Sequence, residues 1–99
     1  MIRLLAAAVL SGLAFGAGSA EAGVVDCHVW AKYPNTLISS ARNMTCRAAA
    51  NDMRSYRGQI YRRLKTPGGF LCQRVSGGQF GGQWRCVRGN RAYRFEFGD

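Results

Sequence analysis

The four cysteines have spacings that constrain what chemistry they can do. Cys27, Cys46, Cys72 and Cys86 are separated by 18, 25 and 13 residues, and no Cys-x-x-Cys pair occurs. Zinc sites use closely spaced ligand pairs, and His28 is the only histidine, so a metal site is not expected. A catalytic thiol would need a partner base and would leave an odd cysteine unpaired. The pattern therefore predicts two disulfides.

Few residues are available for acid–base catalysis. After position 22 the titratable candidates are Asp26, His28, Asp52, Glu96 and Asp99. A carboxylate base at Glu96, an acid at His28 and phosphate-binding arginines would suffice for a small ribonuclease. His28 follows Cys27 in a predicted strand, however, and is expected to be an ordinary strand residue. A ribonuclease is therefore kept as an alternative, with no catalytic residue assigned.

Arginine dominates the charge of this sequence. Residues 23–99 hold 11 arginines and two lysines. Guanidinium groups bind phosphate and carboxylate in a bidentate manner, so this surface is expected to attract an anionic envelope polymer or an acidic protein. A charged surface that only keeps the protein soluble is the simpler interpretation. The arginines that we predict to bind an anion are Arg85, Arg94, Arg88, Arg91, Arg47 and Arg54.

Residues 1–22 have the three parts of an export signal. Arg3 is followed by an uncharged stretch over 4–15 and by small residues up to Ala22. The stretch is shorter than the roughly 20 apolar residues that span a bilayer. Cleavage is expected after Ala22, with Ala20 as the second choice. We therefore expect a secreted or periplasmic protein without a transmembrane segment.

Residues 23–99 are expected to form one small domain. These 77 residues keep 13 of the 14 basic and four of the five acidic residues, so their net charge remains +9. A hydrophobic core of this size supplies only roughly 3–5 kcal/mol. A disulfide that closes a loop of about 15 residues adds roughly 3 kcal/mol. We expect a monomer that needs its disulfides and no cofactor.

The first half of the domain predicts a strand followed by a helix. Residues 24–30 are rich in β-branched and aromatic residues, and 33–35 end this strand. Residues 36–44 are ambiguous between a helical turn and an extended segment. A helix is expected to begin after Thr45 as N-cap and to end near Arg57 or at Leu64, because Gly58 weakens its interior. Its apolar face is formed by Cys46, Ala49, Ala50, Met53, Tyr56, Ile60 and Leu64.

The second half predicts a meander of three strands over 70–75, 84–88 and 92–97. Gly89-Asn90 suits a two-residue hairpin with glycine at its first central position. A first hairpin centred on Gln79 places Cys72 opposite Cys86, at a separation that a disulfide can span. This pairing leaves Cys27 for Cys46.

The predicted register separates the residues of the meander onto two faces. One face collects Phe70, Cys72, Trp84, Cys86, Tyr93, Phe95 and Phe97. The other collects Leu71, Gln73, Val75, Arg85, Val87, Ala92, Arg94 and Glu96. The aromatic face must be buried, and the apolar side of the helix is the surface that can cover it. We therefore predict an α+β fold of order β-α-β-β-β, with the helix packed on a mainly antiparallel sheet.

Four short motifs resemble those of a group of small secreted bacterial proteins. The motifs have the forms A-R-N-x-[ST]-C, G-[FW]-x-C, C-x-[RK]-G and F-x-[FW]-G, and here they begin at Ala41, Gly69, Cys86 and Phe95. The resemblance implies a compact secreted domain and no particular activity, substrate or catalytic residue.

The sequence as a whole favours a non-enzymatic binding domain. Besides the ribonuclease, a third class stays open, an inhibitor of a secreted enzyme. Such an inhibitor would insert Phe80 and the glycine-rich hairpin of 77–82 into the cleft of its partner.

Overall fold

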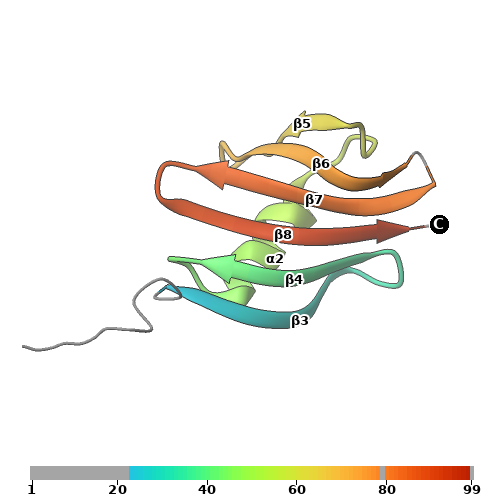
Figure 1. Ribbon diagram of the computed structural model, residues 1–99. Helices are drawn as coiled ribbons and strands as arrows, with labels where there is room; N and C mark the ends of the chain where they lie inside the picture. The colour runs from blue at the N-terminus through green and yellow to red at the C-terminus, as the bar shows by residue number, and fades with distance from the viewer. Residues whose placement is uncertain (1–22, 79, 99) are drawn as a thin grey trace, which may run out of the picture.

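A computed structural model describes residues 23–78 and 80–98 of the chain (Figure 1). The expected export signal over 1–22, with its cleavage after Ala22, and the predicted hairpin centre at Gln79 lie outside the described residues. The elements are β3 (Val24–Lys32), β4 (Thr36–Arg42), α2 (Cys46–Ser55), β5 (Arg63–Lys65), β6 (Leu71–Gly78), β7 (Gly81–Arg88) and β8 (Arg91–Gly98).

All six strands form one antiparallel sheet in the order β3-β4-β8-β7-β6-β5. The helix α2 lies behind this sheet, and the other face of the sheet is turned toward the viewer in Figure 1. The α+β class and the packing of one helix on an antiparallel sheet are therefore confirmed. The predicted order β-α-β-β-β is wrong, since the chain runs β-β-α-β-β-β-β.

The two additional strands come from segments whose patterns were misleading. The ambiguous residues 36–44 contain β4, which lies between β3 and β8 and buries Ile38 and Ala41. The helix ends at Ser55, near the earlier of its two expected ends, because Tyr56 already has extended backbone angles. Its predicted continuation to Leu64 is wrong. Leu64 instead pairs with Cys72 from the edge strand β5 and packs against the core from there.

The start of the helix follows the prediction. The Thr45 hydroxyl accepts a hydrogen bond from the Ala48 amide at 3.0 Å, which satisfies a free donor of the first turn. Ala49, Ala50 and Met53 are the buried residues of the helix. Because two of these three side chains are small, the helix can approach the sheet closely, and its closest neighbours there are β3 and β4.

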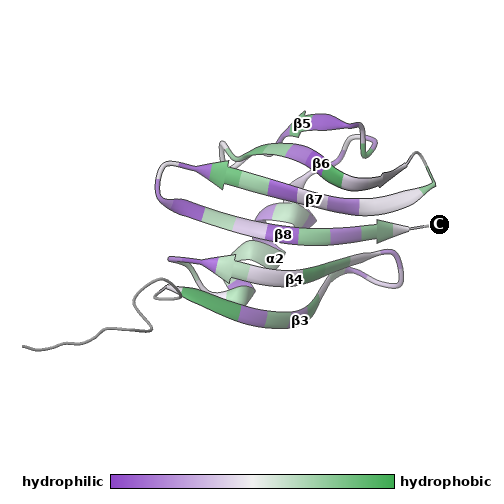
Figure 2. Cartoon of the chain, viewed as in Figure 1, coloured by the Kyte–Doolittle hydropathy of each residue, from purple (hydrophilic) through white to green (hydrophobic). Residues whose placement is uncertain are grey.

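The predicted register is confirmed between β7 and β8 and at the Cys72–Cys86 pair, whereas a bulge between Arg74 and Ser76 shifts the rest of the β6–β7 pairing by one residue. Cys86 pairs with Tyr93, and Arg88 with Arg91 across the Gly89-Asn90 turn, where Gly89 has φ +60°. Cys72 lies opposite Cys86, and both predicted disulfides are present, with Cα–Cα distances of 3.9 Å for Cys72–Cys86 and 5.7 Å for Cys27–Cys46. Hydrophobic and hydrophilic residues alternate along β7 and β8 (Figure 2).

The polar groups of the buried aromatic residues have partners. Trp84 is 1% exposed, and its indole N–H donates to the Tyr61 carbonyl at 2.8 Å. The Tyr93 hydroxyl donates to the Asp52 carboxylate on α2 at 2.6 Å. Burial and this carboxylate raise the pKa of Tyr93 well above its usual value. These bonds allow the aromatic face to be buried without an unpaired polar group.

Asn43 joins three segments at one end of the sheet. It has φ +55°, a left-handed conformation that asparagine tolerates better than most residues. Its backbone N–H donates to the Gly23 carbonyl, and its side-chain amide donates to the Asn90 carbonyl, both at 2.7 Å. The asparagine, threonine and cysteine of the A-R-N-x-[ST]-C motif thus serve the turn, the helix cap and a disulfide, which are structural tasks.

Candidate functional site

Arginine side chains lie together on the face of the sheet that α2 leaves open. Trp84, Cys86, Tyr93 and Phe95 face the helix and are at most 1% exposed. The alternating residues of β7 and β8 therefore project from the opposite, open face. There Arg85 pairs directly with Arg94, as predicted, and Arg94 pairs in turn with Ser40 of β4. Side chains so paired start about 5 Å apart.

A third arginine completes a small hollow. Arg42, at the end of β4, pairs with Ala92 of β8 on the same face. Arg42, Arg85 and Arg94 line a hollow of about 160 Å³ around Ala92, which we call the arginine hollow. The short Ala92 side chain leaves room between the longer neighbours. A second hollow of about 250 Å³ adjoins it and is lined by Arg42, Arg85 and Arg91 together with Asn90.

The electrostatics of the arginine hollow favour an anion. No carboxylate is among the residues that line either hollow. Within residues 23–78 and 80–98, no hydrogen bond from the side chain of Arg42, Arg85 or Arg94 to a protein acceptor is found. Like charges in directly opposite positions destabilise a sheet. A bound phosphate or carboxylate group would remove this repulsion, and it would accept the free N–H groups.

The other predicted arginines do not join this site. Arg47 is exposed on α2, behind the sheet. Arg54 is engaged, since its guanidinium donates to the Ala31 carbonyl at 3.1 Å, the Trp30 carbonyl at 3.2 Å and the Asn51 side chain at 2.7 Å.

The arginines at the β7–β8 turn differ from each other. Arg91 lines the second hollow, whereas the Arg88 side chain runs against Gly69. Of the six predicted arginines, Arg85, Arg94 and Arg91 thus lie around one pair of hollows. Arg42 is the member that sequence reasoning missed, because the bulge between Ile38 and Ser40 interrupts the alternation along 36–42 that would have indicated a strand.

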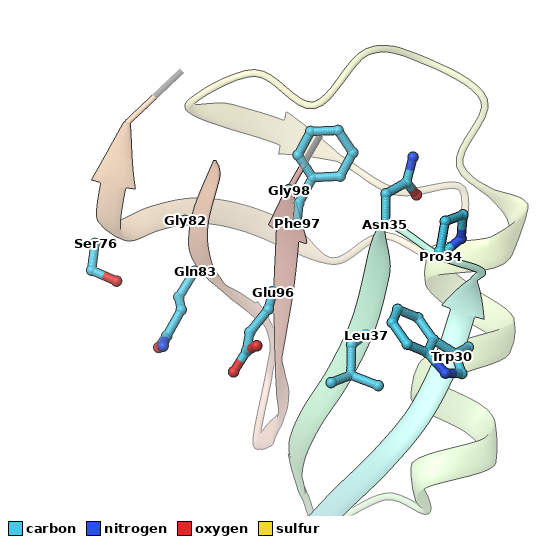
Figure 3. A pocket seen from close by; sticks show the side chains of 10 residues that line it. All are labelled: Trp30, Pro34, Asn35, Leu37, Ser76, Gly82, Gln83, Glu96, Phe97 and Gly98. Atoms are coloured by element: carbon cyan, nitrogen blue, oxygen red, sulfur yellow. The ribbon is translucent and has the colours of Figure 1, made fainter. Parts of the chain in front are cut away.

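The two residues of the ribonuclease alternative lie on different strands. Glu96 is on β8 and His28 is on β3, with β4 between them. Since neighbouring strands are about 4.8 Å apart, the two backbones are separated by roughly 10 Å. Glu96 lines a groove in which His28 takes no part (Figure 3). Phe80, the residue of the inhibitor alternative, is 72% exposed at the β6–β7 turn.

The groove beside Glu96 is larger than the arginine hollow. It measures about 490 Å³, and we call it the polar groove. Gln83 and Glu96 extend side by side from β7 and β8, and Leu37 and Trp30 continue the lining on β4 and β3 (Figure 3). The residues that line the polar groove are Trp30, Pro34, Asn35, Leu37, Ser76, Gly82, Gln83, Glu96, Phe97 and Gly98.

In the part of the chain that the structure describes, no three His, Cys, Asp or Glu side chains gather as a metal site would require. Nor does this part contain a helix that is both long and apolar enough to cross a membrane. No protein-family model, no curated protein and no solved structure matches this chain.

Proposed function

We propose that this domain binds an anionic envelope polymer outside the cytoplasm, through the arginine hollow on its open sheet face. The observation that carries the proposal is the meeting of Arg42, Arg85 and Arg94 around one hollow that no carboxylate lines. Three guanidinium groups supply paired N–H donors that match phosphate, sulfate or carboxylate oxygens. The domain acts as a monomer and as a binding module rather than an enzyme.

The size of the hollow favours a polymer with small acidic groups. A volume of about 160 Å³ accommodates a single phosphate or carboxylate group. An acidic protein would instead need a broad patch of contacts, since stable protein interfaces bury about 800 Å² on each partner. The two disulfides also suit an oxidising compartment, where envelope polymers are found.

Inorganic polyphosphate with a fluorescent label is a suitable probe, and its anisotropy reports binding to the oxidised protein. The double variant Arg85→Gln with Arg94→Gln is expected to weaken binding by about tenfold or more, because hydrogen bonds between charged groups contribute about 1.5–3 kcal/mol each. Wild-type affinity is also expected to fall steeply as the salt concentration rises.

The matched control is Arg57→Gln with Arg62→Gln. Both residues are exposed between α2 and β5, outside the two hollows. The double change removes two positive charges, as many as the Arg85→Gln with Arg94→Gln variant removes. We expect this control to bind polyphosphate within about twofold of wild type, because charges farther apart than the Debye length of about 8 Å are largely screened. Equal weakening by the two double variants would show attraction by net charge alone and would contradict a site at the arginine hollow.

A further inference from the structure

The polar groove is the next site along the same open face. Residues of five neighbouring strands stand in register there, because Ser76 pairs with Gln83, Gln83 with Glu96, Glu96 with Leu37, and Leu37 with Trp30. This row runs parallel to the row that contains Arg85 and Arg94. Glu96 and Arg94 are two residues apart on β8, which places their backbones about 7 Å apart. The two sites can therefore be occupied by one extended molecule.

One end of the polar groove is an aromatic platform that the fold holds in place. Trp30 is 37% exposed, and its ring meets Tyr33 edge to face at 5.0 Å between ring centroids. Leu37 lies directly opposite it on β4. Arg54 hydrogen-bonds to the main-chain carbonyl of Trp30 from behind the sheet, which fixes this part of β3. An exposed indole in a fixed position is suited to stacking against a flat, weakly polar ring face.

The remainder of the groove supplies hydrogen bonds without positive charge. Its polar lining consists of the Asn35 and Gln83 amides, the Ser76 hydroxyl and the Glu96 carboxylate, and no lysine or arginine lines it. Amides and a hydroxyl both donate and accept, and a carboxylate accepts from O–H groups. The carboxylate would repel a phosphate placed beside it. This set of groups suits the hydroxyls of a sugar and is unsuited to a phosphodiester.

We infer that the polar groove binds a sugar ring of an acidic polysaccharide whose acid group occupies the arginine hollow. The apolar face of the ring stacks on Trp30, and its hydroxyls bond to Glu96 and Gln83. A groove of about 490 Å³ lies in the size range of small-molecule sites. The inference rests on the proposed function and specifies its ligand class as a chain that carries both hydroxyl-rich rings and acid groups.

The two tryptophans of the chain make the inference measurable. Trp84 is 1% exposed, so a change of emission on ligand binding reports chiefly on Trp30. The probes are a hexasaccharide in which uronic acid residues alternate with neutral sugar residues (the acidic hexamer), a neutral glucose oligosaccharide of the same length, inorganic polyphosphate and a uridine oligonucleotide. We expect the acidic hexamer to quench the emission and to bind at least about tenfold more tightly than the neutral one, because only the acidic hexamer has carboxylates for the arginines.

Three variants separate stacking on Trp30 from general effects, and titration calorimetry measures their affinities, because two of them lack the fluorescent reporter Trp30. Trp30→Ala is expected to weaken the acidic hexamer about tenfold while leaving polyphosphate binding unchanged, since only the sugar uses the platform. Trp30→Phe keeps an aromatic ring and is expected to keep most of the affinity. This variant is the control for the case in which Trp30→Ala loses affinity through a folding defect. Tyr61→Ala removes a more exposed aromatic side chain that does not line the groove and is expected to change neither affinity.

The results also distinguish this inference from the proposed function. Polyphosphate binding that depends on Arg85 and Arg94, together with no binding of the acidic hexamer or no dependence on Trp30, would overturn the sugar site alone. Polyphosphate binding that ignores the two arginines would overturn the proposed function. Tighter, Trp30-dependent binding of the oligonucleotide than of the acidic hexamer would assign the platform to nucleic-acid bases and overturn the sugar site.

Discussion

The strands β7 and β8 present two contrasting faces. Toward α2, Trp84 and Tyr93 are buried, and their polar atoms bond to Tyr61 and Asp52. Toward solvent, Arg85 and Arg94 are cross-strand neighbours, and their guanidinium groups donate no hydrogen bond to an acceptor among the described residues. Packing accounts for the first face. On the second face the directly opposed like charges are expected to lower stability, which packing does not explain.

Removal of the disulfide at the centre of the covered face is expected to have the largest effect. The double variant Cys72→Ala with Cys86→Ala loses a link between two core strands at a point where both residues are buried. The free energy of unfolding is expected to fall by about 2–5 kcal/mol, as for disulfides of other small domains. Urea unfolding without reductant measures this change. A loss below about 1 kcal/mol would show that packing alone holds the covered face.

Tyr93→Phe tests the bond between the covered face and the helix. Loss of the hydrogen bond to Asp52 is expected to lower the free energy of unfolding by about 1.5–3 kcal/mol. Wild-type stability is also expected to decline with pH. The folded state raises the pKa of Tyr93 above its unfolded value of about 10, so the stabilisation is complete below that pH and is lost as the pH rises beyond it.

The Tyr93→Phe variant is expected to lose part of this decline when urea unfolding is repeated from neutral to alkaline pH. Some slope remains, since burial also raises the pKa of Tyr56. An unchanged pH profile in the variant would contradict the role given to the Tyr93 hydroxyl.

A substitution on the open face is expected to raise the free energy of unfolding, whereas those on the covered face lower it. Arg85→Gln removes one member of a directly opposed like-charged pair and should raise the free energy of unfolding by about 0.2–1 kcal/mol. Thermal unfolding at low salt, where repulsion is least screened, is the sensitive measurement. A destabilised variant would mean that Arg85 supports the fold and would remove the contrast between the two faces.

The sequence predicted best where local pattern and structure have the same period. Alternation over 70–97 placed the β7–β8 register, both faces and the Cys72–Cys86 disulfide, but not the bulge between Arg74 and Ser76. It failed for β4 because a bulge between Ile38 and Ser40 leaves Ile38 and Ala41, three residues apart, both facing the core. That spacing resembles a helix. The strand β5 has only three residues, too few for a period to be visible.

The sequence predicted only the part of the candidate site that follows from the pairing register of β7 with β8. Arg85 and Arg94 follow from the pairing of β7 with β8, which are joined by a short turn. Arg42 reaches them only because β4 pairs with β8, about 50 residues later in the chain. Such long-range pairing has no local signal. Arg54 was misassigned because exposure on a helix does not reveal that its guanidinium turns toward the carbonyls of β3.

The same bonds of Arg54 bear on self-association. β3 is one edge of the sheet, and an edge strand invites the addition of a strand from another molecule. Arg54 occupies the carbonyls of Trp30 and Ala31 and so withdraws two acceptors from such an intruding strand. The opposite edge strand, β5, is only three residues long; it begins with Arg63 and ends with Lys65. Both edges of the sheet thus carry features that disfavour the addition of a strand from another molecule.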